Sequence, residues 1–150
     1  VDPEVLLGEI DMLAELPDDY VRQPAEKLRL YRELDSIRRE EALTAYRDRL
    51  IDRFGPLPEA AVELLNVVRL RWEAVRLGME RVKVKNGLMI VQFVGEQNSP
   101  YYKSETFMTL LRRITAQPDR FVLKQHNNRL AMTVRRVMNV GEAVEVLKSL

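Results

Sequence analysis

The sequence of 150 residues contains no cysteine and a single histidine. The missing cysteines exclude a disulfide framework, a thiol nucleophile and a cysteine-ligated zinc, so we expect no metal site and no cofactor. His126 lies in the polar run Gln-His-Asn-Asn, which predicts a solvent-exposed hairpin turn at 125–128 rather than a ligand. A sequence without cysteine also fits a cytoplasmic setting.

Long apolar runs and glycine-rich loops are also absent. No run reaches the length of about 18 apolar residues that a membrane-spanning helix needs, so we expect no membrane partner. The six glycines are scattered, and none belongs to a phosphate-binding loop or a dinucleotide-binding motif. We therefore assign no catalytic residues, predict that the chain is not itself an enzyme, and place a free-standing enzyme last among three functional hypotheses.

The composition, with 46% apolar and 31% charged residues, is typical of a globular protein. A chain of this length has room for one hydrophobic core, so we predict a single domain over 1–150. Its first residues, Val-Asp-Pro-Glu, do not resemble a signal peptide. They look like a cut point inside a longer protein, and we expect 1–8 to be linker.

The pattern of apolar residues predicts helices first and hairpins afterwards. A short strand at 9–14 ends at the turn Leu-Pro-Asp-Asp. Helical periodicity then covers 25–38, 40–54 and 58–77, and two hairpins, 82–94 around Asn-Gly and 121–134, alternate with two further helices. This order predicts an α+β fold with N-terminal helices followed by two β-hairpins and helices around one antiparallel or mixed sheet.

The helical stripes make predictions about individual side chains. In 25–38, Leu28 belongs to the apolar stripe, and Arg29 and Glu33 lie one turn apart on the outer side, as in a stabilising ion pair. In 40–54, Ile51 widens the apolar face. The third helix is apolar on more than one side, so we expect the ring of Trp72 to be buried in the core.

Charge is distributed unevenly along the chain. Residues 1–60 carry 15 acidic and 9 basic side chains, net −6, whereas 61–150 carry 8 and 15, net +7. The basic half suggests a surface for nucleic acid, although the isoelectric point of 8.2 and the few aromatic residues give this interpretation little support. Its members would be Arg69, Arg71, Arg76, Arg81, Lys83, Lys85, Arg112, Arg113, Arg135 and Arg136.

Specific strings narrow the interpretation. They are Leu-Pro-Asp-Asp-Tyr-Val at 16–21, Leu-Tyr-Arg-Glu-Leu at 30–34 and Leu-Ile-Asp-Arg-Phe-Gly-Pro-Leu-Pro at 50–58, followed by the helix that ends at Leu77-Gly78. In order and spacing they closely resemble the C-terminal domain of the bacterial transcription-repair coupling factor. The resemblance runs from about residue 9 to the end of the chain and weakens after Gly78.

This resemblance implies a role in a larger protein. Members of the family are ATP-driven translocases on double-stranded DNA that remove stalled RNA polymerase and recruit nucleotide excision repair. Their C-terminal domain is a non-catalytic, autoinhibitory domain that docks on the UvrB-like N-terminal module of the same polypeptide and masks the surface for UvrA. The alternative that we keep open is a DNA-contacting accessory domain that uses the basic C-terminal half.

The resemblance also implies candidate partner-binding residues: Asp48, Arg49 and Asp52. Asp52 matches an acidic docking position in the family's Leu-Ile-Asp-Arg-Phe-Gly string. The position directly before that leucine is acidic in some members but is Arg49 here. Asp48, beside it, offers a carboxylate in its place.

Overall fold

The computed structural model of the chain describes residues 15–150. These residues divide into two compact units, 15–69 and 70–150, with the boundary inside helix α4 (Glu59–Leu77). The expected linker at 1–8 and the expected strand at 9–14 lie outside the described residues. The single-domain assignment stays a prediction.

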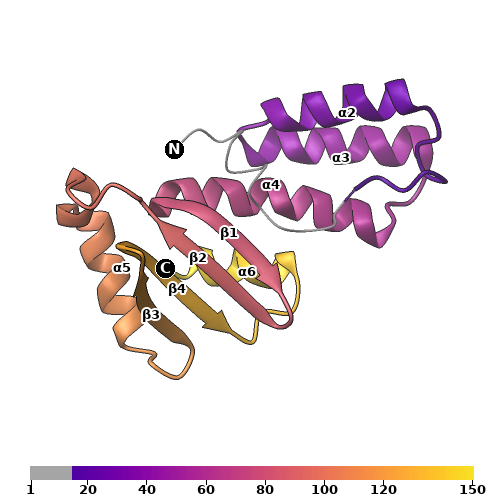
Figure 1. Cartoon of the computed structure of the whole chain (residues 1–150). Helices are drawn as coiled ribbons and strands as arrows, with labels where there is room; N and C mark the ends of the chain where they lie inside the picture. Colours follow the sequence, from indigo (N-terminus) through magenta and orange to yellow (C-terminus); the bar gives the residue numbers. More distant parts are fainter. Residues whose placement is uncertain (1–14) are drawn as a thin grey trace. The chain divides into compact units, whose positions relative to one another are not determined.

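The first unit is helical. It contains α2 (Pro24–Ser36), α3 (Glu40–Phe54) and the beginning of α4, and Figure 1 shows α2 and α3 side by side. Pro24 begins α2, where its missing N–H costs no hydrogen bond. Gly55 ends α3 with φ of 94°, a conformation that favours glycine. These helices confirm the predicted ones to within about two residues, as expected for helix ends.

The interior of this unit includes Leu34 from α2 together with Leu43, Tyr46 and Leu50 from α3. Two predicted apolar positions are not buried: Leu28 is 50% exposed and Ile51 is 40% exposed. Both residues were predicted to lie on the apolar, core-facing side of their helices, and this was wrong. The apolar stripe of a surface helix is only partly covered, and in α3 other residues already fill the positions that face the core.

Tyr20 joins two of the sequence strings that are far apart in the chain. Its hydroxyl donates to the carbonyl oxygens of Leu50, at 3.2 Å, and Gly55, at 2.8 Å. Its ring lies 5.7 Å from that of Phe54, centroid to centroid. The Leu-Pro-Asp-Asp-Tyr-Val string therefore packs against the end of α3, where the Leu-Ile-Asp-Arg-Phe-Gly string lies.

The second unit contains a four-stranded antiparallel sheet in the order β1-β2-β4-β3. Its strands are β1 (Met79–Lys85), β2 (Leu88–Phe93), β3 (Phe121–His126) and β4 (Arg129–Arg135). The remaining elements are the 3₁₀ helix η1 (Pro100–Lys103), α5 (Glu105–Thr115) and α6 (Val140–Lys148). Helices that precede and flank an antiparallel sheet confirm the predicted α+β class.

Asparagine makes both hairpin turns possible. Asn86 and Gly87 have φ of 54° and 76°, and Asn127 and Asn128 have 51° and 61°, the positive values that two-residue hairpin turns need. His126 is exposed but is the last residue of β3, so the second turn is narrower than predicted.

One face of the sheet is buried, and the side chains of the other, which we call the open face, are exposed or partly exposed among the described residues. Side chains that alternate along the strands, among them Val82, Val91, Phe93 and Met132, are buried. The ring of Phe107 on α5 lies 6.1 Å from that of Phe93, which places α5 on this buried face. In Figure 1, α6 lies behind the sheet.

The later part of α4 differs from the prediction at two residues. Trp72 is half-buried, whereas Arg71, which the sequence suggested as a surface cation, is fully buried. Leu70, Ala74 and Leu77 are also buried. The fully buried side of α4 thus passes beside Trp72, because a helix of 3.6 residues per turn covers positions 70, 74 and 77 together.

Buried tyrosines should weaken the fold at alkaline pH. Burial raises the pKa of Tyr46 and Tyr101 above the usual 10.0. Because these phenols ionise more readily in the unfolded chain, their contribution is complete below about pH 10 and is lost as the pH rises through the folded pKa. We expect the free energy of unfolding in urea to fall between about pH 8 and about pH 11.

Tyr46→Phe isolates this effect. The Tyr46 hydroxyl donates to the carbonyl oxygen of Leu30 at 2.9 Å, so the variant should lose about 1 kcal/mol at pH 8. It should also lose less stability than the parent chain on going to pH 11, since one ionisable buried group has been removed. An equal alkaline loss in the two proteins would contradict this explanation.

Candidate functional site

Helix α3 presents two carboxylates and one aliphatic side chain on one side. Ile51 and Asp52 lie three and four residues after Asp48, which places all three on one side of a helix. All three are exposed. We call these residues the α3 face. An exposed aliphatic group between two carboxylates suits contact with a partner that offers both cations and apolar surface.

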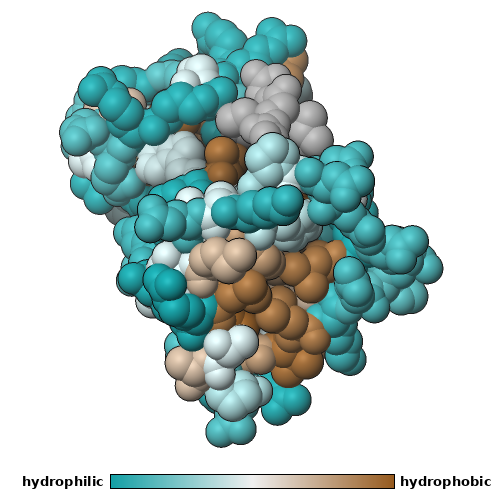
Figure 2. All heavy atoms as spheres, turned by 90° about the vertical axis from the view of Figure 1, so that its left-hand side faces the viewer, coloured by the Kyte–Doolittle hydropathy of each residue, from teal (hydrophilic) through white to brown (hydrophobic). Residues whose placement is uncertain are grey.

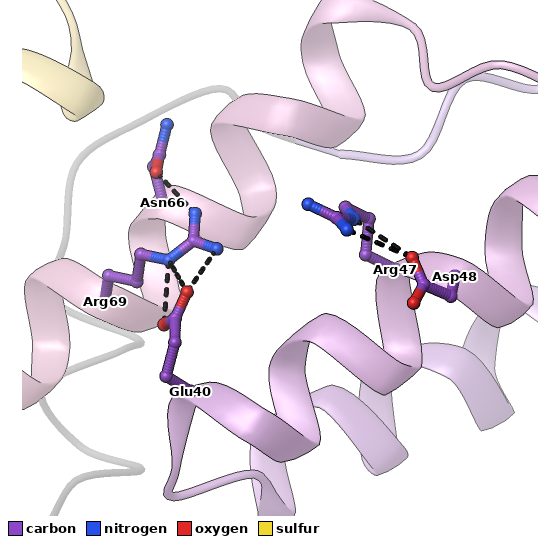
Figure 3. A network of polar contacts seen from close by, with 5 residues as sticks. All are labelled: Glu40, Arg47, Asp48, Asn66 and Arg69. Atoms are coloured by element: carbon purple, nitrogen blue, oxygen red, sulfur yellow. Dashed lines mark hydrogen bonds and ion pairs between the residues drawn. The ribbon is translucent and has the colours of Figure 1, made fainter.

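The two carboxylates have different surroundings. Asp48 pairs with Arg47, its neighbour in the chain, with 3.1 Å between guanidinium and carboxylate (Figure 3). Asp52 forms no ion pair with any residue of 15–150 for which the structure gives contacts. A partner cation can therefore approach Asp52 directly, whereas at Asp48 it would first have to displace Arg47.

Arg49, the third candidate, is held by its own unit. Its guanidinium pairs with Glu33 on α2 and lies 5.9 Å from the centroid of the Tyr46 ring. The pair predicted between Arg29 and Glu33 does not form, since Arg29 pairs with Glu26 instead. That prediction was wrong because packing against α3 supplies Glu33 with a different arginine. Arg49 thus connects two helices.

Further ion pairs fix α3 between its neighbours. Arg53, at the end of α3, pairs with Glu26 of α2. At the start of the helix, Glu40 accepts from Arg69 of α4 at 2.8 Å, and the same guanidinium donates to Asn66 at 2.9 Å (Figure 3). Exposed pairs contribute little stability individually, but they hold the α3 face in one orientation.

A shallow hollow lies beside Arg49, where α2 ends and α3 begins. Its volume is about 500 Å³, and Arg38, Arg39 and Ala45 are among its lining residues. Over residues 15–150, no three histidine, cysteine or acidic side chains gather as metal ligands would. No helix in the same range has the length and apolar character to cross a membrane.

The basic residues of the C-terminal half do not form the single surface suggested by the sequence. Arg69 pairs with Glu40, and Arg71 is buried. Arg76 pairs with Glu73 and donates to the carbonyl oxygen of Leu147, while Arg113 donates to that of Leu150. These four side chains contribute to the fold.

The fold and the α3 face define an α+β module whose candidate site is a charged, exposed surface. The TRCF domain model matches residues 10–104, which is more than half of the chain. The chain belongs to the TRCF domain family.

Relatives agree with this assignment. The chain is 34% identical to the transcription-repair-coupling factor of Escherichia coli over 85 residues, which cover 57% of the chain and 7% of that protein. It is 27% identical to the one of Rickettsia conorii over 112 residues, covering 75% of the chain and 9% of that protein. The chain thus spans less than a tenth of the length of these two relatives.

A solved structure shows the same fold. The crystal structure of the C-terminal domain of transcription-repair coupling factor superposes with a TM-score of 0.67 at 18% identity. The match covers 92% of this chain and 84% of that one. At this identity the likeness concerns the fold.

Sequence reasoning missed parts of the site. It placed Asp48, Arg49 and Asp52 but counted Ile51 only as part of the apolar face of its helix, although its spacing from Asp48 and Asp52 was the available signal. It also missed the pairs of α3 with Glu26 and Glu33, which depend on how α2 packs and leave no local signal.

Proposed function

We propose that this chain is a non-catalytic, autoinhibitory docking domain of a transcription-repair coupling factor. In this proposal it binds the UvrB-like N-terminal module of the same polypeptide and masks the surface for UvrA. The parent is an ATP-driven translocase on double-stranded DNA that removes stalled RNA polymerase and recruits nucleotide excision repair in the cytoplasm. The domain itself needs no cofactor.

The observation that carries the proposal is the α3 face. Asp52 is exposed and has no ion-pair partner among the described residues, and it matches the acidic docking position that the resemblance implies. Exposed carboxylates on a rigid helix favour orientation and fast association with a basic partner surface. Ile51, 40% exposed beside Asp52, adds apolar area to the same contact.

Arg49 fits this proposal although it replaces an acidic residue found in some relatives. Because Glu33 holds its guanidinium, Arg49 adds little repulsion toward a basic partner surface. Asp48 lies one turn before Asp52 and supplies a second carboxylate on the same side of α3. In this chain the docking pair is therefore Asp48 and Asp52, with Arg49 connecting α3 to α2.

A weak contact is enough for this function. A rim ion pair contributes about 1 kcal/mol or less, which gives little affinity between separate molecules. Two modules of one polypeptide meet at an effective concentration on the order of millimolar. At that concentration the same weak contact holds the two modules together and can still dissociate. Opening then requires a state in which the domain makes different contacts.

Charge reversal at Asp52 tests the proposal. In the parent protein, Asp52→Lys should replace attraction with repulsion at the docking surface and raise the apparent affinity for purified UvrA by about 5- to 30-fold, which corresponds to about 1–2 kcal/mol. Titration of the parent protein with UvrA measures this change. Circular dichroism of the 150-residue chain should be unaltered.

Asp19→Lys is the matched control. Asp19 is exposed in the turn before α2 and does not belong to the α3 face, so the variant makes the same charge change at a residue outside that face. It should leave UvrA binding unchanged. If Asp52→Lys has no effect, or if both variants act equally, the α3 face is not the docking site.

A further inference from the structure

Strand β3 is an edge of the sheet, since β4 is its one neighbour among the described strands. In a hairpin with a two-residue turn, the residues next to the turn, here His126 and Arg129, exchange both backbone hydrogen bonds. Every second pair along an antiparallel ladder repeats this exchange. The N–H of Arg135 donates to the carbonyl oxygen of Arg120 at 2.9 Å, which agrees with the alternation.

Two residues of β3 lie between these bonded pairs, namely Leu123 and Gln125. Their N–H and C=O groups therefore point away from β4. Neither residue forms a hydrogen bond on that side with any described residue. Gln125 is exposed and Leu123 is partly exposed. Unpaired backbone groups at a sheet edge can pair with an extended segment of another chain, which then adds a strand to the sheet.

Helix α5 borders this edge. It contacts β3, and the two elements lie side by side in Figure 1. The side chain of Leu123 is on the sheet face that α5 covers, because Leu123 pairs with the buried Met132. On α5, Met108 is 45% exposed, and the partly exposed Leu111 follows three residues later on the same side. Figure 2 views the molecule from this direction and shows apolar side chains gathered in a patch.

We call Met108, Leu111 and Leu123 the α5–β3 patch. Helix α6 does not cover it. Arg113, two residues after Leu111, lies on the opposite side of α5 and donates to the carbonyl oxygen of Leu150, directly after α6. Because α6 occupies that other side of α5, the side that carries Met108 and Leu111 stays accessible to a partner.

A hollow adjoins the end of β3. Its volume is about 270 Å³, and Gln125, Leu130 and Tyr102 are among its lining residues. Gln125 is also one of the two residues with outward backbone groups, so a strand that pairs with β3 brings one of its side chains to this hollow. In recognition by strand addition, backbone hydrogen bonds provide affinity and pockets for alternate side chains provide specificity.

The surroundings of the patch are basic. Residues 100–126 contain five basic side chains and two acidic ones. Glu80, the one acidic residue on the four described strands, lies 3.7 Å from the guanidinium of Arg129. The exposed cations of 100–126 that form no ion pair with a described residue include Lys103, Arg112 and Lys124. A partner with acidic side chains would complement this charge.

We propose that β3 and α5 form a docking groove for an extended segment of a partner protein in which apolar and acidic residues alternate. The segment pairs with the outward backbone groups of Leu123 and Gln125. Alternate side chains of a strand point to opposite faces of the sheet, so its apolar side chains meet the α5–β3 patch. Its acidic side chains then lie on the open face, where Lys124 is placed by its pairing with Ala131.

A peptide titration tests the proposal. The probe is a fluorescein-labelled peptide with the sequence Glu-Val-Glu-Val-Glu-Val-Glu-Val, and its control contains the same residues in two blocks, Glu-Glu-Glu-Glu-Val-Val-Val-Val. Fluorescence anisotropy follows each peptide as the 150-residue chain is added up to about 1 mM. The alternating peptide should bind saturably and at least about 5-fold more tightly than the block peptide, because only alternation separates the apolar and acidic side chains onto two faces.

Two pairs of variants locate the binding. Met108→Glu places a negative charge in the patch and should weaken binding of the alternating peptide by about 10-fold or more. Met138→Glu makes the same change at a methionine that is 69% exposed in front of α6, and should leave binding unchanged. Gln125→Pro removes an outward N–H without removing a bond to β4, and should weaken binding by at least about 5-fold relative to Gln125→Ala, which retains that N–H.

NMR titration of the ¹⁵N-labelled chain adds a direct measurement, since the amide resonances of 121–126 should shift most. Absence of saturable binding up to about 1 mM, equal binding of the two peptides, or equal effects of Met108→Glu and Met138→Glu overturns the proposal. Self-association in sedimentation that Met108→Glu abolishes would overturn it in favour of a second copy of the chain. Binding to vesicles of anionic lipid without peptide binding would overturn it in favour of a lipid surface.

Discussion

Phe93→Ala should lower the free energy of unfolding by about 3–5 kcal/mol, as measured by chemical denaturation of the chain. Phe93 is 0% exposed on β2, an inner strand of the sheet, and its ring meets Phe107 of α5 at 6.1 Å and 80°. The substitution removes this edge-to-face contact and leaves a cavity between sheet and helix, which a packed interior refills only in part.

Two variants separate burial from position on the strand. Phe93→Leu retains most of the side-chain volume and should cost less than Phe93→Ala. Ile90→Ala alters the same strand on its open face, where the side chain is 37% exposed, and should cost clearly less as well. A loss below about 1 kcal/mol for Phe93→Ala would show that the sheet and α5 do not share a packed interior.

Gly78→Ala should cost about 2–4 kcal/mol, which is the second large effect that we expect. Gly78 has φ of 79°, where residues with a side chain are strained. A β-carbon there would lie 2.1 Å from Cε1 of Tyr101, far inside van der Waals contact. The ring cannot withdraw freely, because its hydroxyl donates to the carbonyl oxygen of Leu77.

Gly87→Ala is the matched control for Gly78→Ala. Gly87 has nearly the same φ, 76°, but a β-carbon there meets the sulfur of Met138 at 3.5 Å, an ordinary contact. This variant should therefore show only the conformational cost, about 1–2 kcal/mol. In a Tyr101→Ala background, the loss in free energy of unfolding caused by Gly78→Ala should fall to a similar value. Additive losses at 78 and 101 would contradict the steric explanation.

The helices and hairpins were predictable because their signals are local. Pro24, Gly55 and the Asn86-Gly87 pair each impose a backbone conformation on their own segment. The burial of Arg71 and the partial exposure of Trp72 could not be predicted, because both depend on which side of α4 is covered. The hydrogen bonds from Tyr20 to the end of α3 also join distant residues and leave no periodic signal.

The candidate site was likewise predictable where the signal is local and unpredictable where it depends on contact between helices. Helical spacing predicts that Asp48 and Asp52 share one side of α3, and the structure has both exposed. The pairing of Arg49 with Glu33 depends on contact between two helices, so the sequence left the role of Arg49 undecided. The basic residues of the sheet were predicted in part. Lys124 was omitted because only strand register assigns it to the face of Lys85 and Arg135.

The strand order bears on self-association. Among the described strands, β1 and β3 are the edges of the sheet, and an edge strand offers unpaired backbone groups to another copy of the chain. Each of these edges carries an exposed lysine, Lys85 on β1 and Lys124 on β3, which would meet the same cation of a second molecule. Like charges oppose such pairing, so these two lysines disfavour aggregation of the protein at high concentration.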